Sequence, residues 1–202
     1  MDNAVALVQA YLRLNGYFTV SEFPVVESTR SGYRTATDLD ILAFRFPGAG
    51  RLVPAPGRGQ SKDEEHFAPD QALGTSAESA DMIVGEVKEG RAVLNAASTD
   101  PAVLRAVLVR FGCCPREEAA QLVDRLIHSG DAILPDGHRV RLMAFGSTVG
   151  DGGRYATLLL EHVVRFMEEY IRDHWDVLRH EDQKDPALGF LTTLEKARRQ
   201  LA

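Results

Sequence analysis

Cysteine, lysine and long apolar runs are all scarce in this 202-residue chain, and each shortage excludes a class of protein. The two cysteines, Cys113 and Cys114, are adjacent, which gives neither a disulfide framework nor a metal-ligand spacing. No run approaches the roughly 18 consecutive apolar residues of a membrane span. An acid precedes the first apolar positions at the N-terminus, which argues against a secretory signal. We therefore expect a cytoplasmic protein with reduced thiols and no membrane association.

Basic charge is also in short supply, because the formal net charge is −6. Tight nonspecific binding of nucleic acid depends on Lys and Arg side chains that neutralise phosphates, so the overall charge does not favour it. Only four of the 23 basic residues are lysines, and the remaining bases are arginines that could still form a local basic face. The charge weakens the case for a nucleic-acid partner without removing it.

The periodicity of the apolar residues predicts one α/β domain followed by a helical extension. We divide the chain into an α/β core over 1–150, with a flexible insertion at 47–80, and a C-terminal helical extension over 151–202 that packs on the core. The insertion joins two strands of interest and could act as a flap. Strands are expected over 17–27, 36–46, 82–90 and 139–146, a turn over 28–35, and helices over 3–14, 102–111, 116–128, 155–178 and 186–200.

Two of these strands carry acids within apolar sequence. Asp38 and Asp40 lie in the strand 36–46, and Glu86 precedes Lys88 by two residues at the end of the strand 82–90. Side chains alternate along a strand, so Glu86 and Lys88 project from one face. One interpretation is a surface ion pair at a sheet edge. The other is a site in which two carboxylates bind Mg²⁺ while the lysine orients, or helps to deprotonate, an attacking water.

The segments TDLDILA, with Asp40, and GEVKEG, with Glu86 and Lys88, resemble the PD-(D/E)XK nuclease superfamily. The resemblance covers roughly residues 3–146 and implies a restriction-endonuclease-like αβββαβ core, with a mixed central sheet flanked by helices. It also implies a metal-dependent nuclease that hydrolyses phosphodiester bonds, with DNA as the favoured substrate. Asp40 and Glu86 would bind Mg²⁺ or Mn²⁺, and Asp40, Glu86 and Lys88 would be the catalytic residues. Gln121 is followed four residues later by Arg125 and not by tyrosine, so no branch of the superfamily is assigned.

Further residues could support such a site. Additional acids on the strands before it could join the metal, and arginines in the turn 28–35 and on the strand 139–146 could contact phosphate. The candidate acids are Asp38, Glu22 and Glu27, and the candidate arginines are Arg30, Arg34, Arg139 and Arg141. For each of them a solvated side chain is the simpler interpretation.

Two alternatives stay open. A nuclease-like fold can lose its activity and serve as a binding or regulatory module, because fold does not fix function. The motif could also be a coincidence in an α/β interaction protein. If the chain is a nuclease, cutting both strands of a duplex with one such site needs sequential nicks or two copies, and the C-terminal helices could form a homodimer contact. The sequence does not distinguish DNA from RNA as the substrate.

Overall fold

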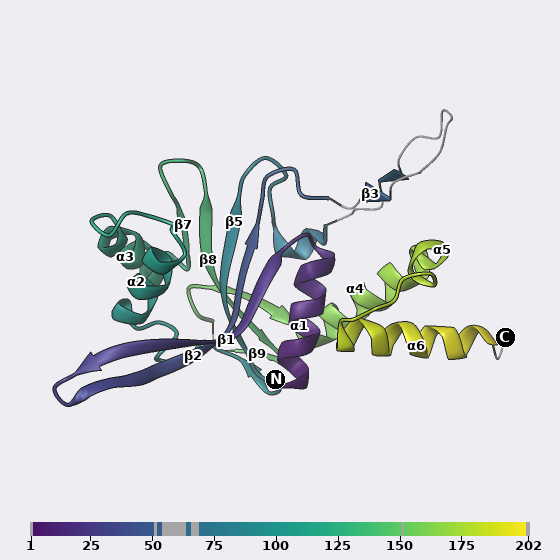
Figure 1. The fold of residues 1–202 in the computed structure, drawn as a ribbon, viewed down its shortest axis with the longest axis horizontal. Coiled ribbons are helices and arrows are strands. Elements are labelled where there is room, and N and C mark those ends of the chain that lie inside the picture. The colour runs from purple at the N-terminus through teal and green to yellow at the C-terminus, as the bar shows by residue number, and fades with distance from the viewer. Residues whose placement is uncertain (1, 51, 54–63, 66–68, 151, 201–202) are drawn as a thin grey trace.

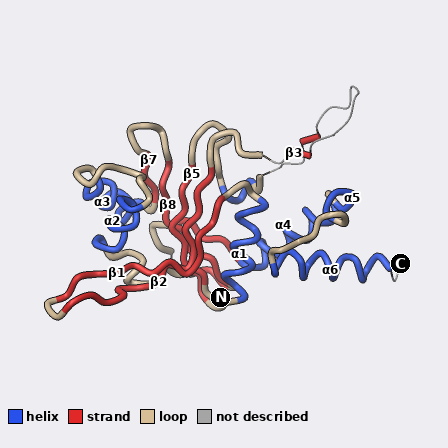
Figure 2. The backbone as a smooth tube through the Cα atoms, in the orientation of Figure 1, coloured by secondary structure: helices blue, strands red, loops and turns tan. Residues whose placement is uncertain are grey.

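The computed structural model describes residues 2–50, 52–53, 64–65, 69–150 and 152–200 (Figure 1). They form an α/β fold with a mixed central sheet and helices on both faces, which confirms the α/β class and the mixed, helix-flanked sheet (Figure 2). Much of the insertion predicted at 47–80 lies outside the described residues, so its role as a flap stays a prediction. None of the described helices is long and apolar enough to cross a membrane.

The central sheet combines an antiparallel half with a parallel half. Its order is β1-β2-β5-β8-β10, with the short β7 also paired to β8. β1 pairs antiparallel with β2 and β2 antiparallel with β5, whereas β5 pairs parallel with β8 and β8 pairs parallel with β10. The strands are β1 (Phe18–Thr29), β2 (Gly32–Arg45), β5 (Asp81–Val87), β7 (Asp131–Ile133), β8 (Arg139–Gly146) and β10 (Ala156–Leu159).

Short strand pairs and a 3-10 turn complete the connections. β3 (Leu52–Val53) pairs with β4 (Glu64–Glu65), and β6 (Arg91–Ala92) pairs with β9 (Thr148–Val149). The 3-10 turn, η1 (Gln71–Leu73), precedes β5.

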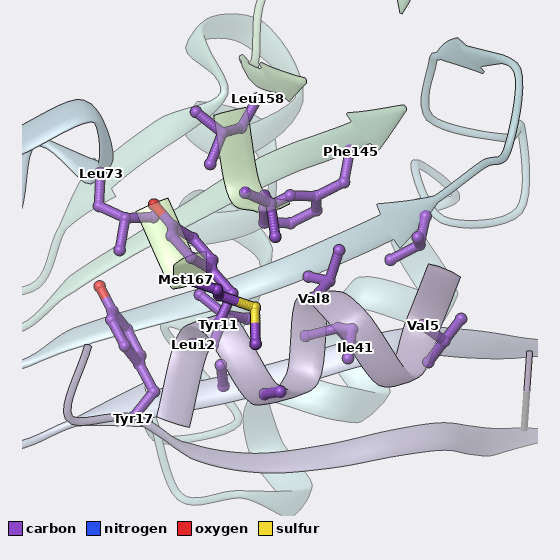
Figure 3. Packing of buried hydrophobic residues seen from close by; sticks show 14 of the residues in the cluster. Val5, Val8, Tyr11, Leu12, Tyr17, Ile41, Leu73, Phe145, Leu158 and Met167 are labelled. Atoms are coloured by element: carbon purple, nitrogen blue, oxygen red, sulfur yellow. The ribbon is translucent and has the colours of Figure 1, made fainter. Parts of the chain in front are cut away.

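Helices cover the two faces of the sheet separately. One face carries α1 (Asn3–Leu14), α4 (Leu160–Asp173) and α6 (Pro186–Gln200), with the short α5 (Trp175–Leu178) between the last two. The other face carries α2 (Pro101–Arg110) and α3 (Ala119–Ser129). Figure 3 shows the core between the sheet and α1, which we call the α1 core. In it, Val8 and Leu12 of α1 lie near Ile41 of β2, Phe145 of β8 and Met167 of α4.

β5 lies at the centre of the sheet, and all seven of its residues are buried. Ile83 and Val87 face the α1 core, whereas Met82 and Val84 face the α2 and α3 core. A strand buried on both faces needs a nearly continuous apolar run, which is what the sequence provides. Gly85 packs closely against β8, because a Cβ there would lie 3.3 Å from the ring of Phe145.

The predicted helices at 3–14 and 186–200 are confirmed with their bounds, and so is the strand 139–146. The side chain of Asp185 accepts the backbone N–H of Ala187 and of Leu188, as expected for the cap of the last helix. α4 and α6 pack with α1 in one core.

Two predicted elements are wrong. The turn over 28–35 is confined to Arg30 and Ser31, because β1 and β2 continue as a long hairpin that projects from the sheet (Figure 1). The helix over 155–178 begins only at Leu160, because residues 156–159 form β10 on the open edge of β8. Helical periodicity in the apolar residues could not reveal that free edge. The helix expected from 116 starts at Ala119.

Candidate active site

Asp40 and Glu86 meet where β2 and β5 separate. Ile41 pairs with Gly85 at the end of the antiparallel ladder, so Asp40 and Glu86 occupy the next position on each strand. The carboxylate of Asp40 spans the gap, because its Oδ2 accepts the backbone N–H of Val87 at 2.9 Å. The sheet therefore places the two predicted metal ligands side by side.

Lys88 completes the cluster from the residue after β5. Its Nζ donates a hydrogen bond to Oε1 of Glu86 and lies 3.7 Å from Oδ2 of Asp40. Its backbone N–H donates to the carbonyl of Phe145 at 2.9 Å, which extends the ladder to β8 beyond the end of β5. The Lys88 side chain is 41% exposed, so it borders solvent while its ammonium lies beside both acids.

Glu86 is 1% exposed, and a buried carboxylate needs donors to offset its desolvation. Besides Lys88, Ser98 donates its hydroxyl to Oε2, and Asn95 donates its side-chain N–H to Oε1 at 2.8 Å. Asn95 also accepts the backbone N–H of Ser98 at 2.6 Å. The loop before α2 therefore fixes the orientation of Glu86. Sequence reasoning missed both residues, because Asn and Ser ahead of a helix indicate no more than a turn.

The charges of the cluster shift two of its pKa values. Burial, together with the nearby negative charge of Glu86, raises the pKa of Asp40 against the opposing effects of the Val87 N–H and Lys88. Burial alone would lower the pKa of Lys88, but the hydrogen bond and charge of Glu86 and the charge of Asp40 outweigh it, and the pKa is raised. Lys88 is therefore an ammonium at neutral pH. In this state it donates a hydrogen bond to Glu86.

The β1 strand is strained opposite this cluster. Glu22 lies across from Asp40, between the regular pairs Ser21–Ile41 and Phe23–Leu39. Its φ is 52°, the only positive φ among the described residues other than glycine. Such backbone is sparsely populated for side chains larger than glycine and is often associated with functional sites. Glu22 is exposed on the strand next to the site.

β2 changes the face of its side chains at the same point. Leu39 packs with Leu42 against α2 and α3, whereas Ile41 packs against α1. Regular strand alternation would place Leu39 and Ile41 on one face, but they lie on opposite faces. Unbroken alternation fails where the hairpin leaves the sheet.

The other candidate acids lie farther along the hairpin. Asp38 is exposed on β2, and no described contact joins it to Asp40 or Glu86. Glu27 forms an ion pair with Arg34 across the hairpin, so neither is held at the site. Arg30 is exposed in the turn of the hairpin.

The arginines of β8 have structural partners. Arg139 pairs with Asp131 of β7. Arg141 is 4% exposed, and its guanidinium donates to Asp81 at 2.7 Å and to the hydroxyl of Tyr17 at 3.1 Å. The prediction that Arg141 lies on an open face is wrong, because α1 and η1 cover that side of β8. Arg141 has no surface with which to contact a phosphate.

Within the described ranges, no group of three or more His, Cys, Asp or Glu side chains is arranged to bind a metal ion. The oxygens at the cluster are those of the two carboxylates, with the hydroxyl of Ser98 beside Glu86. These are hard oxygen donors of the kind that Mg²⁺ prefers, and Mg²⁺ commonly keeps several waters as its remaining ligands. The donor set fits a cation bound through one or two carboxylates.

The chain matches no protein-family model, no curated protein and no solved structure. The case for any function therefore depends on the geometry of Asp40, Glu86 and Lys88.

Proposed function

We propose that this chain is a metal-dependent nuclease that hydrolyses phosphodiester bonds, with DNA as the favoured substrate. The observation that carries the proposal is the meeting of Asp40, Glu86 and Lys88 at one point, where β2 and β5 separate. The order of the elements supports it, because α1, β1, β2 and β5 precede α2 and α3, and β8 returns parallel to β5. An order of this kind supports the αβββαβ core that the resemblance implies.

Asp40 and Glu86 would hold Mg²⁺ or Mn²⁺. A divalent cation there would supply positive charge against the negative charge that develops on a phosphodiester. It would also relieve the repulsion that contributes to the raised pKa of Asp40. Ser98 and Asn95 hold Glu86 in its orientation, so Asp40 is the carboxylate that would move to bind the cation.

Lys88 would act as a fixed hydrogen-bond donor. Its backbone is held by Phe145, and its raised pKa keeps the side chain protonated. An ammonium in this position can orient a water or stabilise a phosphate oxygen, and such preorganised donors give large rate effects. In its protonated state, Lys88 would orient the water or the phosphate.

Cleavage assays test the proposal directly. Labelled linear, circular and branched DNA and RNA are incubated with Mg²⁺ or Mn²⁺ and, separately, with EDTA. We expect metal-dependent cutting that the Asp40→Asn variant lacks. Asp182 and Lys184 offer a matched control, because they form a second acid-x-Lys triplet that is almost fully exposed. The Asp182→Asn variant should cut like the wild type. Equal loss in both variants would refute the assignment.

A second candidate is a nuclease-like module without activity that binds or regulates a partner. Both oxygens of Glu86 already accept hydrogen bonds from described residues, and no third acid is joined to the pair. This arrangement could be a purely structural carboxylate. Calorimetry with Mn²⁺ separates the candidates, since binding that disappears in Asp40→Ala supports the nuclease and its absence in the wild type supports the module.

A further inference from the structure

A groove of about 440 Å³ lies between the hairpin strand β1 and helix α2. Phe23, Pro24, Val25 and Val26 of β1 form its apolar side. Among the described residues that line it, the polar side chains are the guanidinium groups of three arginines and none is an acid. We call it the arginine groove; its arginines are Arg105, Arg110 and Arg116.

These arginines are uncompensated in a chain whose net charge is −6. All three are exposed, and within the described part of the chain Arg105 and Arg116 make no hydrogen bond or ion pair. Arg110 stacks over Phe23, with its guanidinium carbon 5.2 Å from the ring centroid. Asp124 borders a smaller hollow next to Arg105 but forms no ion pair with it. Among the described residues, none of the three arginines therefore has an ion-pair partner.

Both walls of the arginine groove lead to the candidate active site. On one side, Phe23 pairs with Leu39, the residue before Asp40. On the other side, α2 begins three residues after Ser98, whose hydroxyl holds Glu86. In Figure 1 the hairpin and the pair α2 and α3 extend in the same direction from the sheet. A linear polyanion in the groove would thus run toward Asp40 and Glu86.

We propose that the arginine groove binds the phosphodiester backbone of a nucleic acid next to the cleavage site. The inference rests on the proposed function, which it deepens by naming where the substrate lies. Guanidinium groups match phosphate oxygens in geometry and charge, and they are more weakly hydrated than ammonium groups. The apolar side can contact sugars and bases without reading sequence. Exposed positions on α2 and its following loop thus bind the substrate, in place of the arginines on β8.

Fluorescence anisotropy with a short labelled DNA duplex tests the groove in EDTA, so that binding does not depend on cleavage. The double variant Arg105→Gln/Arg116→Gln is compared with Arg172→Gln/Lys196→Gln, which removes the same charge from exposed positions on α4 and α6. Removal of one arginine–phosphate interaction should reduce the slope of log K against log salt by about 0.9. Removal of two such interactions corresponds to about 60-fold weaker DNA binding at 0.1 M salt, if the variant and the wild type bind equally at 1 M salt.

We expect the groove variant to show this weaker binding and the control variant to bind like the wild type. Equal binding by the two double variants would overturn the inference, and so would displacement of the DNA by polyglutamate as effectively as by unlabelled DNA, which would indicate an acidic protein partner. Cleavage by the same proteins in Mg²⁺ separates the two proposals. If the groove variant binds DNA as tightly as the wild type and both proteins cut it, the groove proposal alone is refuted. If the wild type binds DNA but does not cut it, the nuclease proposal is refuted.

Discussion

Ser98 is the most informative position outside the three candidate catalytic residues. Its hydroxyl donates to Oε2 of Glu86, and both side chains are buried, at 2% and 1% exposure. The Ser98→Ala variant removes the donor and leaves a buried carboxylate oxygen without it. Hydrogen bonds to charged groups contribute about 1.5–3 kcal/mol, and an unsatisfied buried group costs a similar amount. We therefore expect the free energy of unfolding to fall by about 1.5–3 kcal/mol.

Urea unfolding measures this difference, and thermal unfolding should show a Tm lowered by about 3–12 °C for a chain of this length. The Ser28→Ala variant is the matched control, because Ser28 is exposed on the hairpin and should change stability by less than about 0.5 kcal/mol. A double-mutant cycle with Asn95→Ala then reports whether the two donors act as one support. A Ser98→Ala variant as stable as the control would refute the view that this loop holds Glu86 in place.

The remaining predictions concern the same sheet. Burial and the charge of Glu86 raise the pKa of Asp40 in the folded protein above its value in the unfolded chain. Ionised Asp40 therefore lowers the free energy of unfolding at neutral pH. This loss disappears as the pH falls from the folded-state pKa of Asp40 to its unfolded-state pKa. Urea unfolding from pH 4 to 7 should therefore show Asp40→Asn to be at least as stable as the wild type at pH 7, and a lower stability would contradict this. Arg141→Leu should lower the free energy of unfolding by about 3–5 kcal/mol, because it leaves Asp81 buried without its cation. Replacement of the exposed Arg172 by Leu should change this free energy by no more than about 0.5 kcal/mol. Similar urea midpoints for the two variants would contradict this prediction. Gly85→Ala should lower the free energy of unfolding by about 1–3 kcal/mol, because the new Cβ meets the ring of Phe145. Gly90→Ala should leave it unchanged, because open space surrounds Gly90. A Gly85→Ala variant as stable as the wild type would show that the Phe145 ring can move aside.

Local patterns in the sequence were sufficient to predict most strands of the sheet and to single out Asp40 and Glu86, which lie side by side. Caps such as Asp185 and the apolar run of β5 are local signals, and they fix helix starts and buried strands. Long-range pairing is not visible in this way. The free edge of β8 turns residues 156–159 into a strand, against their helical periodicity.

The site was predicted only in part for the same reason. Lys88 and Glu86 lie two residues apart, so their contact follows from strand geometry. Ser98 and Asn95 reach Glu86 through a loop whose course depends on the packing of α2. Arg141 looked like an exposed strand residue because the sequence does not show that Asp81 and Tyr17 bury it. The strain at Glu22 likewise arises only where the hairpin leaves the sheet.

One comparison tests the central claim, that Asp40, Glu86 and Lys88 form a metal-dependent nuclease site, most directly. The rate of DNA cleavage is measured under single-turnover conditions for the wild type, Lys88→Met and Lys184→Met. Both lysines form an ion pair with an acid two residues earlier, but only Lys88 also lies beside Asp40. We predict that Lys88→Met lowers the rate by about 100-fold or more, as does removal of other preorganised donors, and that Lys184→Met has no effect. Full cleavage by a folded Lys88→Met variant would contradict the account.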